Sequence, residues 1–301
     1  MCHKKIIRGD ILEFNILSNE NSSFKGYICN GIKSSNVEEL HKLGYYGKGM
    51  RVGICDTGIN RNHSFLKDNI LCGKNFTNEG TIDDFTDNNT HGSFVASEIL
   101  QVAPKAQLVI AKCLDKNGSG SYDSIVNGIK YCVEQGCHVI NLSLGGTVNN
   151  KELYEVIVDA IVNKNILFCC ASGNNGDGNG ETDEINYPAN YEEVINVGAL
   201  ETDSNIADFS NSNYYVDLVA SGVNLVGCYK DGNYWCKSSG TSMACPIVAS
   251  IGLLLREKFI KEYGRNPSEK ELYAEIIKNT KELPNVDRRL QGHGRIYIEG
   301  E

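Results

Sequence analysis

The stretch Ser238-Ser239-Gly240-Thr241-Ser242-Met243-Ala244-Cys245-Pro246 leads directly into a long apolar run, residues 247–255, which ends in charged sequence from Arg256 onward. Small residues, then a serine, then an apolar segment of helical length predict that Ser242 lies at the N-terminus of a buried helix. Unpaired backbone N–H groups and the positive end of the helix dipole gather at such a terminus. Pro246 is expected within the first turn or so, where its missing N–H costs little.

Ser242 has two interpretations at this position. A serine before a helix is most often an N-cap, whose hydroxyl accepts a hydrogen bond from the first turn. Alternatively, it is a nucleophile, and the oxyanion formed during its attack would face the same N–H groups. The second interpretation requires a base and an orienting acid elsewhere in the chain.

Outward from this stretch, short apolar strands alternate with amphipathic helices. We expect strands at 50–55, 107–112, 138–143, 166–170, 194–198 and 216–220, and helices at 91–100, 121–134, 151–163 and 268–279. This alternation is typical of an α/β fold with a parallel sheet covered by helices on both faces. We find no internal repeat or linker, so one domain, residues 36–301, follows a polar N-terminal extension, residues 1–35.

Composition excludes several classes of partner. The 301 residues are 41% hydrophobic and 22% charged, which is ordinary for a globular protein, and the net charge of −9 argues against nucleic acid or an anionic membrane as partner. Several of the twelve cysteines lie in apolar strand-like runs and show no zinc-ligand spacing, so we expect buried free thiols. Many free thiols without an export signal predict a cytoplasmic protein.

Three polar residues lie where predicted strands and helices meet loops. Asp56 closes the strand 50–55, Asn174 leaves the strand 166–170, and His91 begins a helix after a polar loop. In open parallel sheets, catalytic groups collect beyond the carboxyl ends of the strands. A histidine with an ordinary pKa of about 6.5 suits a general base. Each residue also has a plain interpretation, as a turn former or as an ordinary surface or core histidine.

Together, Asp56, His91, Asn174 and Ser242 occur in an order that resembles the subtilisin-like serine proteases, and the nearest similarity is to the intracellular subtilisins. The resemblance spans about residues 47–298 and depends on Asp-Thr-Gly at 56–58, His-Gly at 91–92, Ser-Leu-Gly-Gly at 143–146, Ser-Gly-Asn at 172–174 and Gly-Thr-Ser-Met-Ala-x-Pro at 240–246. It implies a three-layer fold with a mostly parallel, twisted sheet and helices on both faces.

The resemblance also implies a serine endopeptidase that acts through an Asp-His-Ser triad and an acyl-enzyme intermediate. His91 would take the proton from Ser242, and Asp56 would hold the imidazole tautomer. Asn174 would donate to the oxyanion together with the Ser242 N–H. Substrate would pair as an added strand with the segments that correspond to the family's binding residues, namely Ser143, Leu144 and Gly145, then Ala171, Ser172 and Gly173, and roughly residues 114–122.

The sequence departs from the family pattern in places that concern packing and calcium. Phe94 and Ile247 replace histidines that are common but not catalytic. The helix after His91 runs through residues 98–104 without the loop that binds a tight calcium ion in many subtilases, and Asn60 stands where those enzymes often have a ligating Asp. A hard cation needs six to eight oxygens, so we expect that site to be absent and no cofactor to be required for the chemistry.

A structural Ca²⁺ site at an acidic loop remains an open alternative. Asp83, Asp84 and Asp87 could attract a cation, although a solvated acidic loop is the simpler interpretation.

Intracellular subtilisins also carry a short N-terminal segment that lies across the active site until it is cut. Residues 11–14, Ile-Leu-Glu-Phe, occupy a comparable position but lack the proline that is usual there. By this resemblance, the extension 1–35 would inhibit the enzyme or be removed. The same analogy implies a homodimer and intracellular proteins or peptides as substrates.

Two other classes remain open. Asp-Thr-Gly also begins aspartic-protease sites, but those need two such carboxylates and this chain has one such motif. A non-catalytic binding protein on a protease fold would be indicated by a missing triad member, and none is missing.

Overall fold

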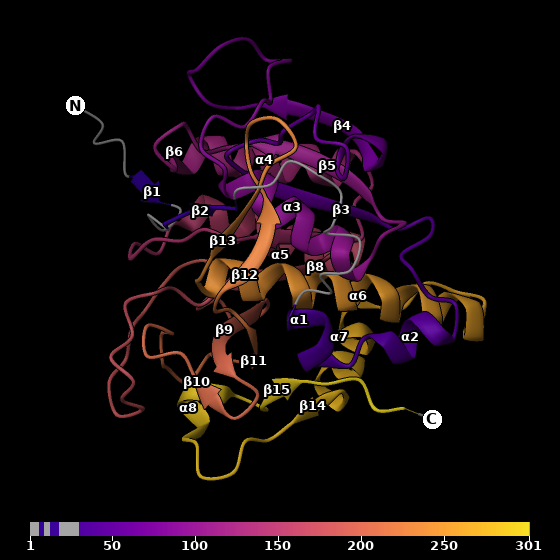
Figure 1. Ribbon diagram of the computed structural model, residues 1–301, viewed down its shortest axis with the longest axis vertical. Helices are drawn as coiled ribbons and strands as arrows, with labels where there is room; N and C mark the ends of the chain where they lie inside the picture. The colour runs from indigo at the N-terminus through magenta and orange to yellow at the C-terminus, as the bar shows by residue number, and fades with distance from the viewer. Residues whose placement is uncertain (1–5, 9–12, 18–29, 301) are drawn as a thin grey trace.

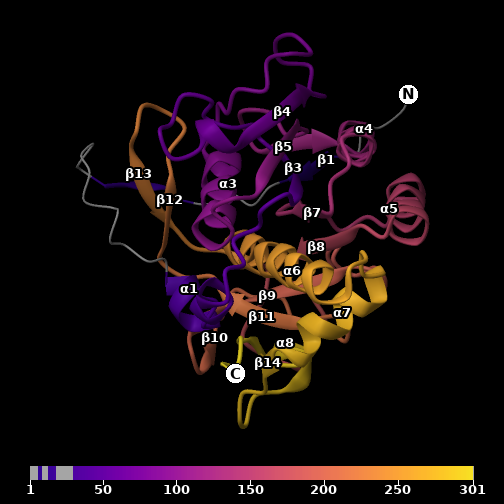
Figure 2. The same cartoon turned by 90° about the vertical axis from the view of Figure 1, so that its right-hand side faces the viewer.

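A mostly parallel sheet forms the middle layer of the protein. The structure is a computed structural model that describes residues 6–8, 13–17 and 30–300. Within them, the sheet has ten strands in the order β14-β15-β11-β9-β8-β7-β3-β5-β4, with β10 paired to β9. Helices α4 and α5 cover one face, and α3 and α6 cover the other (Figure 1, Figure 2). The predicted three-layer α/β fold is confirmed.

Six parallel strands carry the centre of the sheet, and each overlaps its predicted range. They are β3 (Arg51–Asp56), β5 (Gln107–Lys112), β7 (Val139–Leu142), β8 (Leu167–Ala171), β9 (Ile195–Thr202) and β11 (Leu218–Ser221). Their residues are almost all buried because helices cover both faces, which explains their continuous apolar sequences. Because β3, β7 and β8 are parallel neighbours, their carboxyl ends lie at the same edge of the sheet.

The predicted helices are also present. They are α3 (His91–Val102), α4 (Tyr122–Glu134), α5 (Lys151–Lys164) and α7 (Glu269–Lys278), together with the long α6 (Thr241–Tyr263) and the short α2 (Glu38–Lys42) and α8 (Arg288–Gln291). Ser268 and Glu271 form the predicted capping box at the start of α7.

Two apolar cores lie on opposite sides of the sheet. Alternate β3 residues point to opposite faces, so Val52 and Ile54 join the core under α3 and α6, and Cys55 joins the core under α4 and α5. Gly53 allows α4 to approach closely, because a Cβ there would lie 2.7 Å from Cys132 Sγ. Of the ten cysteines in the described residues, all are free and only Cys72 is not fully buried.

Helix α6 is the buried centre of one layer, and it starts earlier than the sequence suggested. Thr241 is its first residue, so Pro246 is the sixth and lies inside the helix, just beyond the first turn. The expectation that its missing N–H costs little is therefore wrong. A proline at this position cannot donate to the carbonyl of Ser242, four residues earlier. Ser143 Oγ donates to that carbonyl instead, at 2.8 Å. The residue after β7 thus supplies the hydrogen-bond donor that the helix itself cannot provide at Pro246.

Several short elements were not anticipated. They are β4 (Ile70–Asn75), β6 (Ser119–Ser121), β10 (Asn205–Ile206), the hairpin of β12 (Leu225–Cys228) and β13 (Trp235–Ser238), the edge strands β14 (Thr280–Lys281) and β15 (Arg295–Ile296), and the 3-10 turn η2 (Lys67–Asn69).

The N-terminal extension contributes three more elements. β1 (Ile6–Arg8) pairs antiparallel with β6, and β2 (Asn15–Ile16) pairs with β13. α1 (Asn30–Ser35) packs against β11, so the end of the predicted extension is part of the folded layer system. Residues 11 and 12 of the predicted inhibitory segment lie outside the described residues, whereas Phe14 packs on Phe94 with ring centroids 5.9 Å apart.

Candidate active site

Asp56 and His91 meet beyond the carboxyl edge of the sheet. Asp56 is the last residue of β3, His91 is the first residue of α3, and both are buried. Asp56 Oδ1 lies 2.7 Å from His91 Nδ1 and also accepts the Thr57 N–H at 2.7 Å. A carboxylate at Nδ1 favours the tautomer with the proton on Nδ1, so Nε2 is the ring nitrogen that can take up a proton.

Ser242 is the second residue of α6, and it is not the cap. The N-cap is Gly240, and α6 has no side-chain capping bond from that residue. Ser242 Oγ donates to Ser143 O at 3.2 Å, at the end of β7. The interpretation of Ser242 as a helix cap is therefore wrong, and its hydroxyl lies at the sheet edge where β3, β7 and β8 end.

Asn174 follows β8 and caps the same helix. Its Oδ1 accepts the Thr241 N–H at 2.9 Å and the Thr241 hydroxyl at 2.9 Å. These two bonds fix the amide orientation, so Nδ2 is the end of the side chain that points away from Thr241. The structure thus brings an amide donor and the start of α6 together, although the two are far apart in sequence.

The segments expected to bind substrate end neighbouring strands. Ser143, Leu144 and Gly145 follow β7, and Ala171, Ser172 and Gly173 end and follow β8. Because β7 and β8 are adjacent, the two segments lie side by side at one edge of the sheet.

Sequence reasoning missed Asn186, which lies between these two segments. A Cβ on Gly145 would be 2.1 Å from Asn186 Nδ2, and one on Gly173 would be 3.2 Å from it. Asn186 Nδ2 also donates to Ala171 O at 3.4 Å. No motif marks this residue, because its position depends on a loop that returns to the sheet edge.

The third predicted binding segment, residues 114–122, contains β6. Residues Ser119–Ser121 of β6 are the partners of β1 from the chain's own N-terminus. An extended segment therefore already lies antiparallel on this edge.

The acidic loop before His91 is not uniform. Asp83 and Asp84 are exposed, and hydrogen bonds from Thr86 lower the pKa of Asp84. Asp87 is buried, so the interpretation as a solvated acidic loop is wrong for this residue. In the described part of the chain, no group of three or more His, Cys, Asp or Glu side chains is arranged to hold a metal ion. Asn60 Nδ2 donates to Tyr229 O and Gly232 O, holding the loop after β12.

A buried lysine lies next to the Asp56 strand end. Lys112, the last residue of β5, donates from Nζ to Thr57 O at 2.7 Å, and its side chain is almost fully buried. A buried ammonium needs such partners, because its desolvation is otherwise costly.

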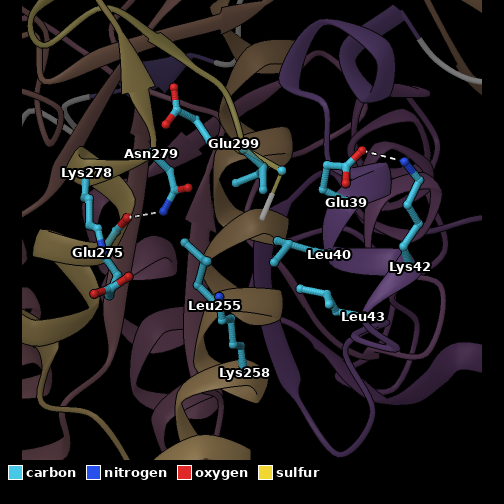
Figure 3. Close-up of a pocket in the computed structure, with 12 residues that line it drawn as sticks. Glu39, Leu40, Lys42, Leu43, Leu255, Lys258, Glu275, Lys278, Asn279 and Glu299 are labelled. Atoms are coloured by element: carbon cyan, nitrogen blue, oxygen red, sulfur yellow. Dashed lines mark hydrogen bonds and ion pairs between the residues drawn. The ribbon is translucent and has the colours of Figure 1, made fainter.

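The cavity drawn in Figure 3 is a separate feature. It has a volume of about 370 Å³ and lies against the second half of α6, between α2, α7 and the C-terminal segment. Leu40 and Leu255 contribute apolar surface, and the Lys42–Glu39 ion pair lies at its border. Leu255 is thirteen residues after Ser242, which is roughly 20 Å along a helix. None of the candidate catalytic side chains lines this cavity.

A parallel sheet between two helical layers, with an Asp–His pair at its carboxyl edge and a serine at the start of the buried helix, defines the class of subtilisin-like serine proteases. The sequence profile of the Subtilase family matches residues 47–294, so the chain belongs to the Subtilase family. The predicted resemblance is confirmed, and the protein is a subtilisin-type serine endopeptidase.

Its relatives include proteases named as intracellular. An intracellular serine protease of Paenibacillus polymyxa is 43% identical over 263 residues, which cover 84% of this chain and 80% of the relative. The major intracellular serine protease of Bacillus subtilis (strain 168) is 38% identical over 304 residues, covering 97% and 94%. Subtilisin E of that strain is 36% identical over 237 residues, covering 76% and 61%. No helix in the described ranges has the length and apolar character needed to cross a bilayer.

Proposed function

We propose that Ser242, His91 and Asp56 hydrolyse peptide bonds through an acyl-enzyme intermediate. The observation that carries the proposal is the 2.7 Å contact between His91 Nδ1 and Asp56 Oδ1 in a buried setting. That contact leaves Nε2 as the basic nitrogen. In the proposed reaction, Nε2 takes the Ser242 proton as Oγ attacks the carbonyl carbon, and then protonates the leaving amine. Water, activated in the same way, releases the acyl group.

Asn174 and the start of α6 are proposed to bind the oxyanion. Asn174 Oδ1 is held by Thr241, which turns Nδ2 outward as a donor. The Ser242 N–H belongs to the first turn of α6, where backbone donors have no partner within the helix. Fixed donors of this kind stabilise the charge that develops in the transition state.

A serine-directed fluorophosphonate tests the nucleophile. We expect the probe to label Ser242 in the wild type and to fail on Ser242→Ala, with hydrolysis of denatured casein lost in Ser242→Ala and His91→Ala. Ser239→Ala is the matched control, because the Ser239 hydroxyl accepts the Asn224 N–H and Ser239 lies two residues before α6. Casein hydrolysis that survives Ser242→Ala would contradict the proposal.

Substrates are proposed to be intracellular proteins or peptides that bind as an added strand. The antiparallel pairing of β1 with Ser119–Ser121 supports this mode, because it demonstrates that the edge of β6 accepts an extended segment. The names of two relatives as intracellular proteases support the cellular setting.

We further propose that the extension, residues 1–35, blocks the site until it is displaced or cut. Its pairing with β6 competes with substrate for the same edge, and Glu13 O accepts from Ser238 Oγ, just ahead of α6. A variant lacking residues 1–20 should have a higher initial rate on a short peptide substrate than the full chain. Equal initial rates, with equal fluorophosphonate labelling, would rule out inhibition by this segment.

A further inference from the structure

The Asp87 carboxylate lies next to the Asp56–His91 pair, and the proposed chemistry does not use it. Asp87 is only 2% exposed. Five donors surround it: Oδ1 accepts from Thr57 Oγ1 at 2.9 Å, Asn89 N at 2.8 Å and Thr90 N at 2.9 Å, and Oδ2 accepts from Ser93 N at 2.9 Å and Ser93 Oγ at 2.6 Å. Because a buried charge is costly unless it is hydrogen-bonded, this number of donors indicates a fixed position.

The first turn of α3 obtains its hydrogen-bond acceptors from outside the helix. The N-cap residue Thr90 makes no side-chain capping bond. Instead, His91 N–H donates to Asn89 Oδ1 at 3.2 Å, Gly92 N–H to Thr57 Oγ1 at 2.9 Å, and Ser93 N–H to Asp87 Oδ2 at 2.9 Å. These groups have no acceptor within a helix, so Asp87 caps the turn that carries His91.

Thr90, directly before His91, has a strained backbone. Its φ is +120°, outside the regions that a β-branched residue normally adopts. Such strain persists only where the surrounding structure holds it. The Thr90 N–H donates to Asp87 Oδ1. This hydrogen bond restrains the backbone at Thr90, and a rotation of that backbone would displace His91.

The Thr57 hydroxyl links both catalytic candidates to Asp87. It donates to Asp87 Oδ1 and accepts from the Gly92 N–H. Thr57 follows Asp56 in the chain, and Gly92 follows His91. One hydroxyl therefore joins the end of β3 to the start of α3, and Asp87 determines its orientation.

We propose that Asp87 is a positioning residue that keeps the His91 imidazole in line with Asp56 by fixing the Thr57 hydroxyl and the first turn of α3. This inference rests on the proposed function, since it requires His91 to be the base. A displacement of about 1 Å in a catalytic group can cost about 10²-fold in rate. Asp87 makes none of its hydrogen bonds to the substrate-binding segments, so its loss acts on kcat and leaves KM nearly unchanged.

The test compares Asp87→Asn with Asp84→Asn. The amide has the shape of the carboxylate but turns an NH₂ group toward donors, either at Ser93 or at the Oδ1 partners. We expect kcat to fall about 10- to 100-fold in Asp87→Asn, with KM within about twofold of wild type. Asp84→Asn removes an exposed carboxylate from the same loop and should match the wild type.

Two readouts separate positioning from simple stabilisation. The proton between His91 Nδ1 and Asp56 Oδ1 should give a far-downfield NMR signal in wild type that shifts or broadens in Asp87→Asn. The acid limb of the kcat/KM profile should move to lower pH, because loss of a nearby anion and a looser Asp56 contact both disfavour the imidazolium. Thr57→Val should act in the same direction, and the Asp87→Asn/Thr57→Val pair should cost less than the product of the two single effects.

Four outcomes test the positioning role of Asp87 and distinguish it from the proposed triad. If Asp87→Asn folds with wild-type kcat, pH profile and NMR signal and only its melting temperature falls, the positioning role is overturned. If Asp87→Asn does not fold, Thr57→Val and Ser93→Ala carry the same readouts, and wild-type values in both would overturn it. If His91→Ala and Ser242→Ala keep full activity, the proposed triad itself fails. Inactivity of those two together with wild-type Asp87→Asn removes this inference alone.

Discussion

The side-chain amide of Asn174 is held at one end by Thr241, and the proposed role in binding the oxyanion belongs to the other end. Its carbonyl oxygen caps the first N–H of α6 through Thr241, so the amide cannot rotate without losing two hydrogen bonds. The orientation of Nδ2 is therefore set before any substrate binds. This is the preorganisation that makes a donor effective toward a developing charge.

Substitutions at Asn174 can separate the role of the Oδ1 acceptor from the role of the Nδ2 donor. Asn174→Asp keeps an acceptor for Thr241 but has no donor, and Asn174→Ala loses both. We expect kcat to fall by about 10²–10³ in each, with KM little changed, because the proposed interaction with the oxyanion would exist only in the transition state. Steady-state kinetics on a chromogenic peptide measure this, with the exposed neighbour Asn175→Ala as control. A wild-type kcat in Asn174→Asp would refute the role.

Asn186 is expected to shape the pocket for the residue before the cleaved bond. Its amide lies between Gly145 and Gly173. If the segments 143–145 and 171–173 bind substrate as proposed, a substrate side chain would enter between them. Asn186→Ala should widen this space and shift cleavage toward larger apolar side chains, and a peptide library can measure the change. Ile185 is 39% exposed, and Ile185→Ala should leave the preference unchanged. An identical preference in Asn186→Ala would place the pocket elsewhere.

At the level of elements, the start of α6 depends on the end of β7. Pro246 leaves the Ser242 carbonyl without an internal donor, and Ser143 Oγ fills the place. Asn141 Nδ2 in turn donates to Ser143 Oγ at 2.9 Å, so a strand side chain orients the hydroxyl. Helix α6, which carries Ser242, is thereby hydrogen-bonded to the sheet edge as well as packed on it.

This dependence predicts a compensating pair of substitutions. Ser143→Ala leaves a buried carbonyl without a donor and should lower the free energy of unfolding by about 1–3 kcal/mol. In Ser143→Ala/Pro246→Ala, the new N–H of residue 246 can donate to the Ser242 carbonyl, so part of the loss should be recovered. Denaturant unfolding of the single and double variants measures both. If the double variant loses as much as the two single variants combined, the hydrogen-bond account is wrong.

For the whole molecule, two partly buried groups give stability opposite dependences on pH. Asp217, directly before β11, accepts from Asn196 N of β9 and from the Tyr273 hydroxyl of α7 at 2.6 Å. Burial raises the pKa of Asp217 from 3.8 to about 6, although these hydrogen bonds oppose the rise. The folded state thus holds its proton longer than the unfolded state, and this contribution to stability is lost as pH rises from about 4 to above 6.

His138 has the opposite effect on how the stability of the protein depends on pH. It precedes β7, and its Nδ1 accepts the Arg51 N–H at 2.9 Å. Burial and the charges of Arg256 and Arg51 lower the pKa of His138 from 6.5 to about 4. The unfolded state gains a proton first, so stability is lost as pH falls from about 6.5 toward 4.

The two effects can be separated by measuring unfolding free energies from pH 4 to 7. Relative to wild type, Asp217→Asn should gain up to about 3 kcal/mol as pH rises through 6, since each pKa unit is worth about 1.4 kcal/mol. His138→Asn should gain a similar amount, about 3 kcal/mol, as pH falls from 6.5 to 4. Parallel pH curves for wild type and both variants would contradict these assignments.

The sequence by itself determined the layered architecture and the chemical groups of the candidate site. Buried parallel strands require continuous apolar runs, and the helices between them require apolar residues spaced about one helical turn apart. The alternation of these two patterns therefore predicted the six central strands and the four principal helices between and after them. Asp56, His91, Asn174 and Ser242 were found because each lies at a strand end or helix start in a motif of small residues.

Only the tertiary structure decided how these groups are held. Asp87 resembles its exposed neighbours Asp83 and Asp84 in sequence, and it differs because Thr57 and the first turn of α3 surround it. Asn186 and the pairing of β1 with β6 likewise depend on contacts between segments far apart in the chain. Burial and hydrogen bonding arise from such contacts, and the local sequence around a residue does not specify which distant residue will donate a hydrogen bond to it. The local pattern therefore specified the elements, and the packing of those elements specified the partners.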